Sequence, residues 1–233
     1  MLEYRSWRPT TPEGHVWCVQ TDDPSHRILP DGVMDLIWTG EKFIFAGPDS
    51  TAATVDLGHG PTTWGFQLAP GFANAMLALP VSELRDQRLD LKELVRIPEA
   101  IWDQAFHDPA LALSTLARTL LTQSSPNLEV IRLAVSIDRS ARAGVSVEGI
   151  ADEHYVSVRK LRRLSHEVFG YGPKTLTAIH RLQSALRQIE AGSLFGHAAA
   201  SSGYSDQAHL SREAKRLTGS TLTDLTRTSR SLA

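Results

Sequence analysis

The chain has 233 residues, of which 42% are hydrophobic and 21% are charged, and its formal net charge is −2; this balance is typical of a soluble globular protein. No apolar run approaches the roughly 20 residues that a membrane helix needs, and the first residues lack the apolar segment of a signal peptide. Cys18 is the only cysteine, which excludes an internal disulfide and a site with several cysteine ligands and agrees with a reducing cytoplasm.

The first 70 residues carry the pattern of β-strands. The stretch "ILPDGVMDLIW" has a Pro-Asp-Gly turn at 30–32, followed by an apolar run. Residues 39–42 are typical of a hairpin loop, and "FIFA" is typical of the returning strand. In "TTWGFQLAPG" the residues Trp64, Phe66 and Leu68 alternate with others, so they share one face of a strand. We therefore expect a small N-terminal domain of the β-barrel or sandwich-like type.

Three residues of this domain are candidates for binding an effector. Asp35 lies in "MDLIW", and Trp38 and Trp64 are large enough to line a pocket. A residue such as Asp35 more often pairs with an arginine or faces water at the strand edge. Large aromatic residues such as the two tryptophans more often belong to the core, because a small domain needs large side chains to bury enough surface. The histidines form no His-x-His or His-Glu-x-x-His pattern, so we expect no metal, no cofactor and no catalytic residue.

A helical connector follows the β-rich part, and "SSPN" at 124–127 is the most linker-like stretch. We place the domain boundary there, so that an α+β chain has a β-rich regulatory domain at 1–124 and an all-α domain at 125–233. The charge divides near the same point. Residues 1–127 hold nine basic and 16 acidic residues, a net −7, and the remainder holds 15 basic and 10 acidic residues, a net +5. A basic half suggests a polyanion as partner, although Arg-rich helices are often only solvated.

The first helical unit, "SVEGIADEHYVSVRKLRRLSHEVFG", spans residues 146–170. Ser146 and Ser157 are placed to cap two successive helices. The second helix combines a buried stripe at a spacing of three and four residues with a basic face. The basic residues are Arg159, Lys160, Arg162 and Arg163. A helix fits the major groove of DNA, where an arginine can donate two hydrogen bonds to a guanine; on its own, the pattern also fits a solvated surface.

The second unit, "LFGHAAASSGYSDQAHLSREAKRLTG", spans residues 194–219. Gly203 supplies the backbone freedom that a sharp turn needs, and Ser205 or Asp206 is placed to cap the helix that follows. Leucines of that helix face inward. Its outward face carries Gln207, His209, Arg212 and Arg216. The pattern predicts a second helix-turn-helix unit.

One helix is predicted between the two units, from "GPKTLTAIHRLQSALRQIEAG". Pro173 lies at its start, where a missing N–H has no cost, and Gly192 ends it. Roughly 19 residues at about 1.5 Å each span about 28 Å, which is close to one turn of B-DNA, about 34 Å. A rigid helix of this length would place the two units in successive major grooves on one face of the duplex.

Residues from about 146 to 228 resemble the paired helix-turn-helix domain of the AraC/XylS transcription regulators. The matching motifs are "GYGPKTL" and "RLQSAL" in the joining helix and "GYSDQAHLSR" and "KRLTG" in the second unit. In the first unit Ala151, Ser157, Leu161 and Arg163 match. The N-terminal stretch from "RILPDGVMDLIW" to "MLALPVSEL" is similar to the short N-terminal domain of one AraC-like subgroup.

The chain departs from the family pattern at four positions. Tyr155 stands where the family has a turn glycine, and Leu222 replaces a proline in the closing segment. Ser165 and Ala214 replace core phenylalanines. A smaller core side chain that leaves a cavity costs about 2–5 kcal/mol, so we expect neighbouring residues to fill that space.

The resemblance implies which residues contact DNA. Base-reading roles fall on Arg159, Arg162 and Arg163 in the first unit and on Gln207, Ala208, His209 and Arg212 in the second. Phosphate contacts, which position the protein without specifying a sequence, fall on Ser157, Lys160, Lys174, Ser205, Lys215 and Arg216. The implied partners are double-stranded DNA, RNA polymerase, a small-molecule effector and a second copy of the chain, with no membrane.

These features together predict a cytoplasmic, bacterial-type transcription regulator rather than an enzyme. It would bind DNA by sequence and respond to a small molecule or a partner through its N-terminal domain. Two alternatives stay open. One is a barrel enzyme fused to a DNA-binding module, which would need either more cysteines or a histidine cluster. The other is a regulator whose N-terminal domain only dimerises.

Overall fold

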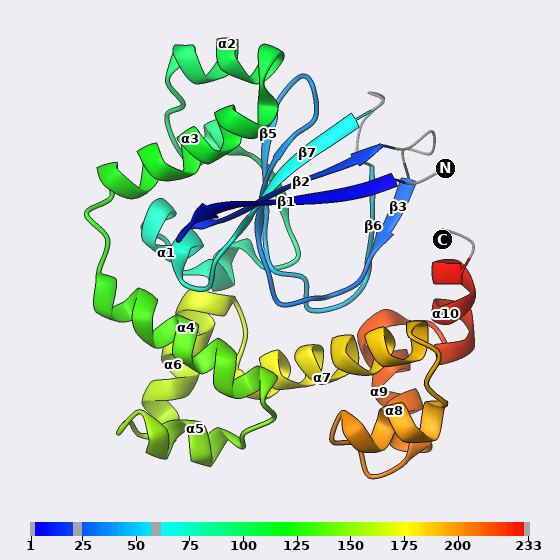
Figure 1. The fold of residues 1–233 in the computed structure, drawn as a ribbon. Helices are drawn as coiled ribbons and strands as arrows, with labels where there is room; N and C mark the ends of the chain where they lie inside the picture. The colour runs from blue at the N-terminus through cyan, green and yellow to red at the C-terminus, as the bar shows by residue number, and fades with distance from the viewer. Residues whose placement is uncertain (1–2, 21–24, 57–61, 231–233) are drawn as a thin grey trace.

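The computed structural model describes residues 3–20, 25–56 and 62–230, and in it a sheet-rich part precedes a helical part (Figure 1). The strands are β1 (Glu3–Thr11), β2 (Gly14–Gln20), β3 (Ser25–Ile28), β4 (Asp35–Trp38), β5 (Phe43–Ala46), β6 (Ala53–Asp56), β7 (Thr62–Leu68) and β8 (Arg88–Asp90). The helices that accompany the sheet are α1 (Phe72–Leu77), α2 (Glu99–His107) and α3 (Pro109–Gln123), with the short 3₁₀ helices η1 (Val81–Leu84) and η2 (Leu91–Glu93). The helices of the second part are α4 (Leu128–Arg142), α5 (Val147–Glu153), α6 (Val158–Phe169), α7 (Pro173–Glu190), α8 (Phe195–Ser201), α9 (Gln207–Thr218) and α10 (Leu222–Arg230).

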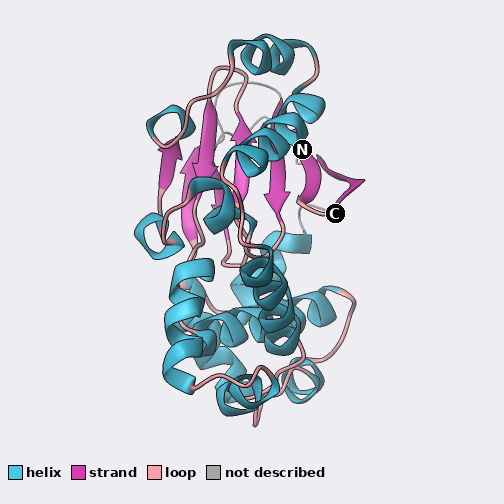
Figure 2. Cartoon of the chain, turned by 90° about the vertical axis from the view of Figure 1, so that its left-hand side faces the viewer, coloured by secondary structure: helices cyan, strands magenta, loops and turns pink. Residues whose placement is uncertain are grey.

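The main sheet has six antiparallel strands in the order β1-β2-β7-β4-β5-β8, and β3 and β6 form a separate two-stranded sheet. Strands β1 and β8 are its edges, so the sheet is not closed into a barrel. The expected α+β class and sandwich-like N-terminal domain are confirmed (Figure 2). The predicted hairpin is β4–β5, in which Asp35 pairs with Ala46.

One face of the main sheet forms the core of the N-terminal part. Leu36, Phe45 and Phe66 are fully buried there, in a cluster that includes residues of α1, α2 and α3. The Trp38 ring lies 4.7 Å from that of Phe43, measured between centroids, and Trp64 packs against the same cluster. Trp38 and Trp64 are therefore core residues.

The opposite face carries a polar row across five strands. His15 pairs with Gln67, Gln67 with Asp35, Asp35 with Ala46, and Ala46 with Arg88, so their side chains share this face. The Asp35 carboxylate accepts a hydrogen bond from Trp17 Nε1 at 2.7 Å. Burial, and then the negative charge of Asp31, raises the pKa of Asp35 to about 7.

The second part has its own core, built around α7. Leu176, Ile179 and Leu182 of α7 are fully buried, as the periodicity of the joining helix predicted. Along α4, Ile131 packs with the first core and Ala134 with the second; the predicted boundary at residue 124 stays a prediction. In the described ranges, no helix has both the length and the apolar character to cross a membrane.

The two parts touch at several places, and three of these contacts concern the ends of α6 and α9 and the middle of α7. Gln183 Nε2 in α7 donates a hydrogen bond to the carbonyl oxygen of Pro30 at 2.8 Å. The N–H of Ala52 donates to the carbonyl oxygen of Leu217, in the last turn of α9, at 2.8 Å. The third contact is at Gly170, after α6, where a Cβ atom would lie 2.6 Å from Pro48 Cγ. The N-terminal part thus contacts both helical units and the helix between them.

The turn between α5 and α6 contains a non-glycine residue with a left-handed backbone. Tyr155 has φ 53°, and its side chain is 97% exposed, so it contributes no packing. This explains why the related family has glycine there, since the left-handed conformation costs a residue with a Cβ atom roughly 1–2 kcal/mol of free energy.

We therefore expect Tyr155→Gly to stabilise the protein by about 0.5–1 kcal/mol, because the strain is relieved while the more flexible unfolded chain offsets part of the gain. The free energy of unfolding, measured with urea, tests this. Tyr155→Ala is the control, because alanine keeps the Cβ atom and should gain little. An equal gain in both variants would show that the tyrosine ring, not the backbone, is the cause.

The raised pKa of Asp35 makes stability depend on pH. Its folded-state pKa, about 7, is above the roughly 3.9 of an unfolded chain, so the folded state holds a proton that the unfolded state has lost. The contribution of Asp35 to stability therefore falls as the pH rises from about 4 to about 7.

Asp35→Asn should raise Tm at pH 8 and have little effect at pH 4, because asparagine stays neutral and its amide oxygen can still accept from Trp17. A gain of 1 kcal/mol corresponds to roughly 2–4 °C in Tm for a domain of 150–250 residues. Thermal unfolding from pH 4 to pH 8 measures this, with the exposed Asp103→Asn in α2 as control. A lower Tm at pH 8 for Asp35→Asn would contradict the assignment.

Candidate nucleic-acid interface

The first helix-turn-helix unit consists of α5 and α6. The Ser146 hydroxyl accepts a hydrogen bond from the Gly149 N–H at 3.0 Å, and the Ser157 hydroxyl accepts one from the Lys160 N–H at 3.2 Å; both predicted caps are present. Leu161 is fully buried. The exposed side of α6 carries Arg159, Lys160, Arg162 and Arg163.

The small residue Ser165 is accommodated by a polar contact. It is fully buried, and its hydroxyl donates a hydrogen bond to the carbonyl oxygen of Tyr171 at 2.8 Å. The neighbouring Phe169 is also buried in this core. The bond holds the segment that joins α6 to α7, so Ser165 links the first unit to the helix that positions it.

The second unit consists of α8 and α9, joined by a turn in which Gly203 has φ 79°. The Asp206 carboxylate accepts a hydrogen bond from the His209 N–H at 2.6 Å, and this bond lowers the pKa of Asp206. Asp206, rather than Ser205, is thus the cap of α9. The exposed candidates on α9 are Gln207, Ala208 and Arg212.

His209 differs from the other base-reading candidates because it has partners within the protein. Its ring stands edge-on to that of Tyr204, with 5.2 Å between centroids, and its Nδ1 lies 3.2 Å from the Ser205 hydroxyl. Contact with a base through Nδ1 would require it to leave Ser205. The Nε2 edge of His209 is the part that remains for DNA.

Two of the phosphate-contact candidates also have internal partners. Lys215 Nζ donates to the carbonyl oxygen of Gly219 at 2.8 Å, at the C-terminal end of α9, where a cation is favourable. Arg216 donates two hydrogen bonds to Glu213, at 2.9 and 2.7 Å, and this pair lowers the pKa of Glu213. The other four candidates, Ser157, Lys160, Lys174 and Ser205, are exposed, although the hydroxyl of Ser157 caps α6 and that of Ser205 lies next to His209.

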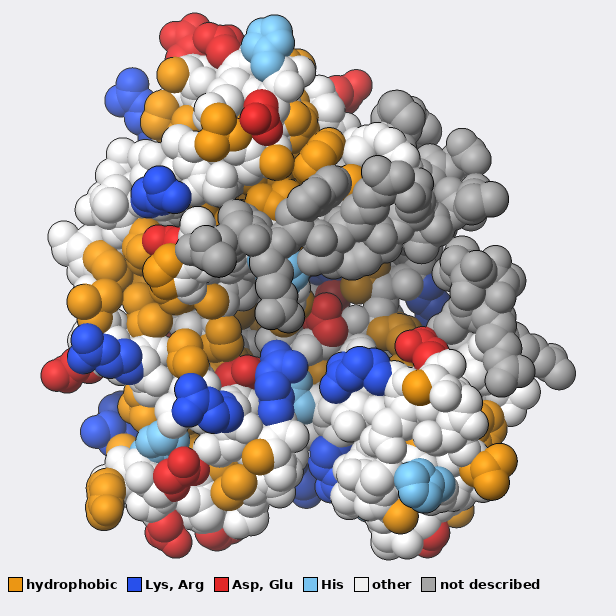
Figure 3. Space-filling view, viewed as in Figure 1, with side chains coloured by type: hydrophobic (Ala, Val, Ile, Leu, Met, Phe, Trp, Pro, Cys, Tyr) orange, Lys and Arg blue, Asp and Glu red, His pale blue; other side chains and the backbone are white. Residues whose placement is uncertain are grey.

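A groove of about 1250 Å³ lies between the two units. Its lining includes Arg162 of α6, Lys174 of α7 and Arg216 of α9, so both recognition helices face the same space. Arg85 and Arg181 also line it, against the two carboxylates Glu148 and Glu213. Figure 3 shows Lys and Arg side chains along the helical half where it meets the sheet domain. The excess of cations in the groove suits a polyanion.

Sequence reasoning missed Arg85 and Arg181. The Arg181 Nε donates to the carbonyl oxygen of Ser202 at 3.0 Å, and its guanidinium lies 4.4 Å from the centroid of the Tyr204 ring. Arg181 therefore attaches the second unit to α7. Arg181 is the arginine of the "RLQSAL" motif, so the sequence did mark its position. Arg85 belongs to the N-terminal part, and no local sequence pattern marks it as a residue of the groove.

The structure does not bring the three effector candidates together. Trp38 and Trp64 pack on the helix-covered face of the sheet, whereas Asp35 lies on the other face with Trp17. The alternative expectation, an arginine paired with Asp35, is not met either: in the described part of the chain, no salt bridge involves it. Among the described residues, no cluster of three or more His, Cys, Asp or Glu is arranged to hold a metal ion.

Comparison with known proteins agrees with this geometry. A helix-turn-helix domain family matches residues 150–228, and a domain of unknown function, DUF6597, matches residues 14–90. A search of curated protein sequences gives no match. The crystal structure of ToxT from Vibrio cholerae O395 is similar with a TM-score of 0.50 at 8% identity, over 96% of each chain. Unsaturated fatty acid bound ToxT from Vibrio cholerae strain SCE256 gives 0.48 at 9% identity, over 94% of this chain and 97% of that one.

The likeness to ToxT of strain O395 is one of fold, and it extends over both parts of the chain rather than over the helical part alone. The family match covers α6 to α9 in full, together with the turn that contains Tyr155. Residues 150–228 are therefore an AraC-type helix-turn-helix domain, and a separate N-terminal domain precedes it.

Proposed function

We propose that this regulator binds DNA in a sequence-specific manner, with α6 and α9 in successive major grooves on one face of the duplex, and that its N-terminal part responds to a small molecule. The observation that carries the DNA-binding proposal is the single basic groove flanked by both recognition helices. Arg159, Arg162 and Arg163 would read bases from α6. The proposal assigns no chemical reaction to the chain.

The spacing of the two units supports this mode of binding. The helix α7 has 18 residues without an internal glycine or proline, and at about 1.5 Å per residue it spans about 27 Å. The centres of two half-sites one turn apart are separated by about 34 Å. Side chains that reach outward from α6 and α9 account for the difference.

The contacts between the two parts support a response to a small molecule. The N-terminal part touches the end of α6, the middle of α7 and the end of α9. A ligand that shifts the N-terminal part would therefore act on both recognition helices and on the helix between them. A ligand can shift such an equilibrium only by its differential affinity for the two arrangements, so it must bind where they differ.

We predict that Arg163→Ala weakens binding to a specific site far more than binding to random DNA. A lost bidentate contact with a guanine removes ~1–3 kcal/mol of discrimination, roughly 5- to 150-fold. Gel-shift titration of the full chain against operator and random duplexes measures this. Affinity of the wild type should also fall steeply with salt, because phosphate binding releases counterions.

Arg132→Ala is the matched control, since it removes the same charge from an exposed position of α4, which is neither of the two recognition helices. It should change both affinities only slightly. Equal losses on the two duplexes for Arg163→Ala would assign Arg163 to the phosphate backbone, and an affinity that does not change with salt would argue against DNA as the partner.

We also predict that the spacing between the two half-sites is strict. Because α7 is continuous and both units are attached to it, inserting ~5 bp between half-sites turns one of them to the opposite face of the duplex, which repeats every ~10 bp. Affinity should drop toward that of a single unit. Gel-shift measurements over a series of spacer lengths test this, and tolerance of several spacers would show that the units move independently.

A further inference from the structure

Arg85 is a cation of the N-terminal part that faces the basic groove between the two helical units. It lines this groove together with Arg162, Lys174 and Arg216. It directly follows η1, and its side chain is 44% exposed. Its Nε lies 3.5 Å from a carboxylate oxygen of Asp86. Among the described residues, none accepts a hydrogen bond from its two terminal amino groups, so these groups can donate to a partner from outside the chain.

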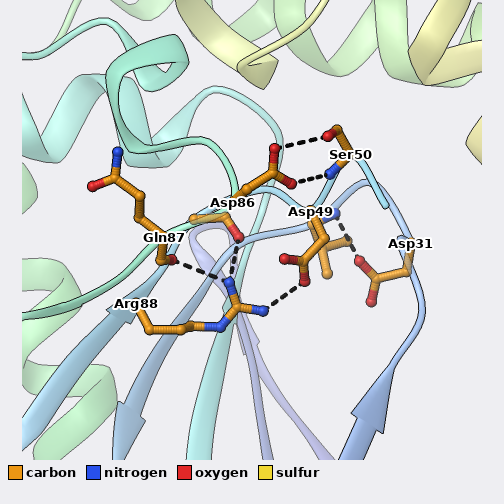
Figure 4. A network of polar contacts seen from close by, with 8 residues as sticks. Asp31, Asp49, Ser50, Asp86, Gln87 and Arg88 are labelled. Atoms are coloured by element: carbon orange, nitrogen blue, oxygen red, sulfur yellow. Dashed lines mark hydrogen bonds and ion pairs between the residues drawn. The ribbon is translucent and has the colours of Figure 1, made fainter. Parts of the chain in front are cut away.

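The loop that carries Arg85 is tied to the loop that follows β5 (Figure 4). The Ser50 N–H and the Ser50 hydroxyl donate hydrogen bonds to the two carboxylate oxygens of Asp86, at 2.6 and 2.7 Å. Arg88 forms an ion pair with Asp49 at 2.6 Å. Because these contacts hold the residues that follow Arg85, its backbone has a defined position relative to the sheet.

The same two loops rest on the C-terminal end of α6. A Cβ atom on Gly170, the residue after this helix, would lie 2.6 Å from Pro48 Cγ and 3.3 Å from the carbonyl oxygen of Val81 in η1. A Cβ atom on Gly47 would lie 1.8 Å from the carbonyl oxygen of Leu84, at the end of η1. Neither glycine leaves room for a side chain, so η1 and the residue that follows it are packed closely against α6.

This position favours a contact with the DNA backbone rather than with a base. The N-terminal residues of a recognition helix contact base edges, and in α6 the first half carries Arg159, Arg162 and Arg163. Arg85 follows η1, which packs at the opposite end of that helix. An arginine can donate two parallel hydrogen bonds to a phosphate. Five Lys and Arg residues and two carboxylates line the groove, so a phosphate there would meet a positive potential.

We propose that Arg85 binds a phosphate of the DNA backbone beside the half-site that α6 reads, so that the N-terminal part forms one wall of the nucleic-acid interface; this inference rests on the proposed binding of DNA in the groove. Phosphate contacts position a protein without specifying a sequence, so Arg85 adds affinity for any duplex. A ligand that shifts the N-terminal part would displace this contact and change the affinity for DNA without changing the sequence preference.

Titration of the full chain with a mixed-sequence duplex three turns long, about 30 bp, tests the contact without an operator. Fluorescence anisotropy measures affinity over a range of NaCl concentrations. In Arg85→Ala the slope of log K against log [NaCl] should become less negative by about 0.9, the value for one phosphate of B-DNA. Affinity at about 50 mM NaCl should fall by roughly tenfold. Arg85→Lys keeps the charge and should keep the slope.

Arg96→Ala is the matched control, because Arg96 is an exposed arginine of the same part and lines a different groove with Trp102. Its slope should equal that of the wild type. An unchanged slope in Arg85→Ala, or an equal change in Arg96→Ala, would overturn the phosphate contact and leave the proposed function intact if the wild type binds DNA. A wild type that binds no DNA at any salt concentration would refute both.

A cross-linking experiment measures the position of residue 85 directly. Cys18, the only cysteine of the chain, is buried, so a maleimide photo-crosslinker reacts selectively with an exposed cysteine introduced by Arg85→Cys. The labelled protein should cross-link to the bound duplex, whereas the same label on Arg96→Cys should not. No cross-link from position 85, or equal yields from both positions, would contradict the placement of Arg85 against DNA.

Discussion

The position of α7 between the N-terminal part and the second unit is the constraint on which the other features depend. Gln183 of this helix bonds to Pro30 in the N-terminal part, and Arg181 stacks on Tyr204 in the second unit. Helices bend sharply mainly at proline, glycine or an inserted group, and α7 has none of these residues beyond its first position. A force applied to its middle therefore moves both recognition helices together. One helix is thus common to the proposed spacing of the DNA half-sites and to the proposed response to a ligand.

A buried hydrogen bond fixes α7 to α4. His180 bonds to Asp138 of α4 at 2.7 Å, and Arg142 bonds to the other oxygen at 2.7 Å. Burial opposes ionisation of Asp138, but the two hydrogen bonds outweigh it, and its pKa is lowered. Breaking a buried pair by removing one partner costs several kcal/mol, because the remaining charge is left without compensation. The position of α7 relative to α4 is thus strongly specified, whereas its contact with the N-terminal part depends on neutral hydrogen bonds.

Sequence reasoning found the elements that local chemistry determines. The caps Ser146, Ser157 and Asp206, the helix from Pro173 and the β4–β5 hairpin follow from residue type and spacing within a few positions. It could not find groups whose position depends on distant chain segments. Arg85 reaches the groove only because the N-terminal part rests on α6, and Asp35 proved to have Trp17 as its partner because β2, β7 and β4 lie side by side. Residue type alone also could not settle whether Trp38 and Trp64 belong to the core or line a pocket, because large aromatic side chains occur in both.

The contacts between the N-terminal part and the helical part show where the acidic and basic halves of the chain meet. The acidic half carries a net −7 and the basic half a net +5, yet each salt bridge among the described residues joins two groups of the same half. The groove between the two helical units receives a cation, Arg85, from the acidic half. The N-terminal part therefore adds positive charge to this groove although its own net charge is negative.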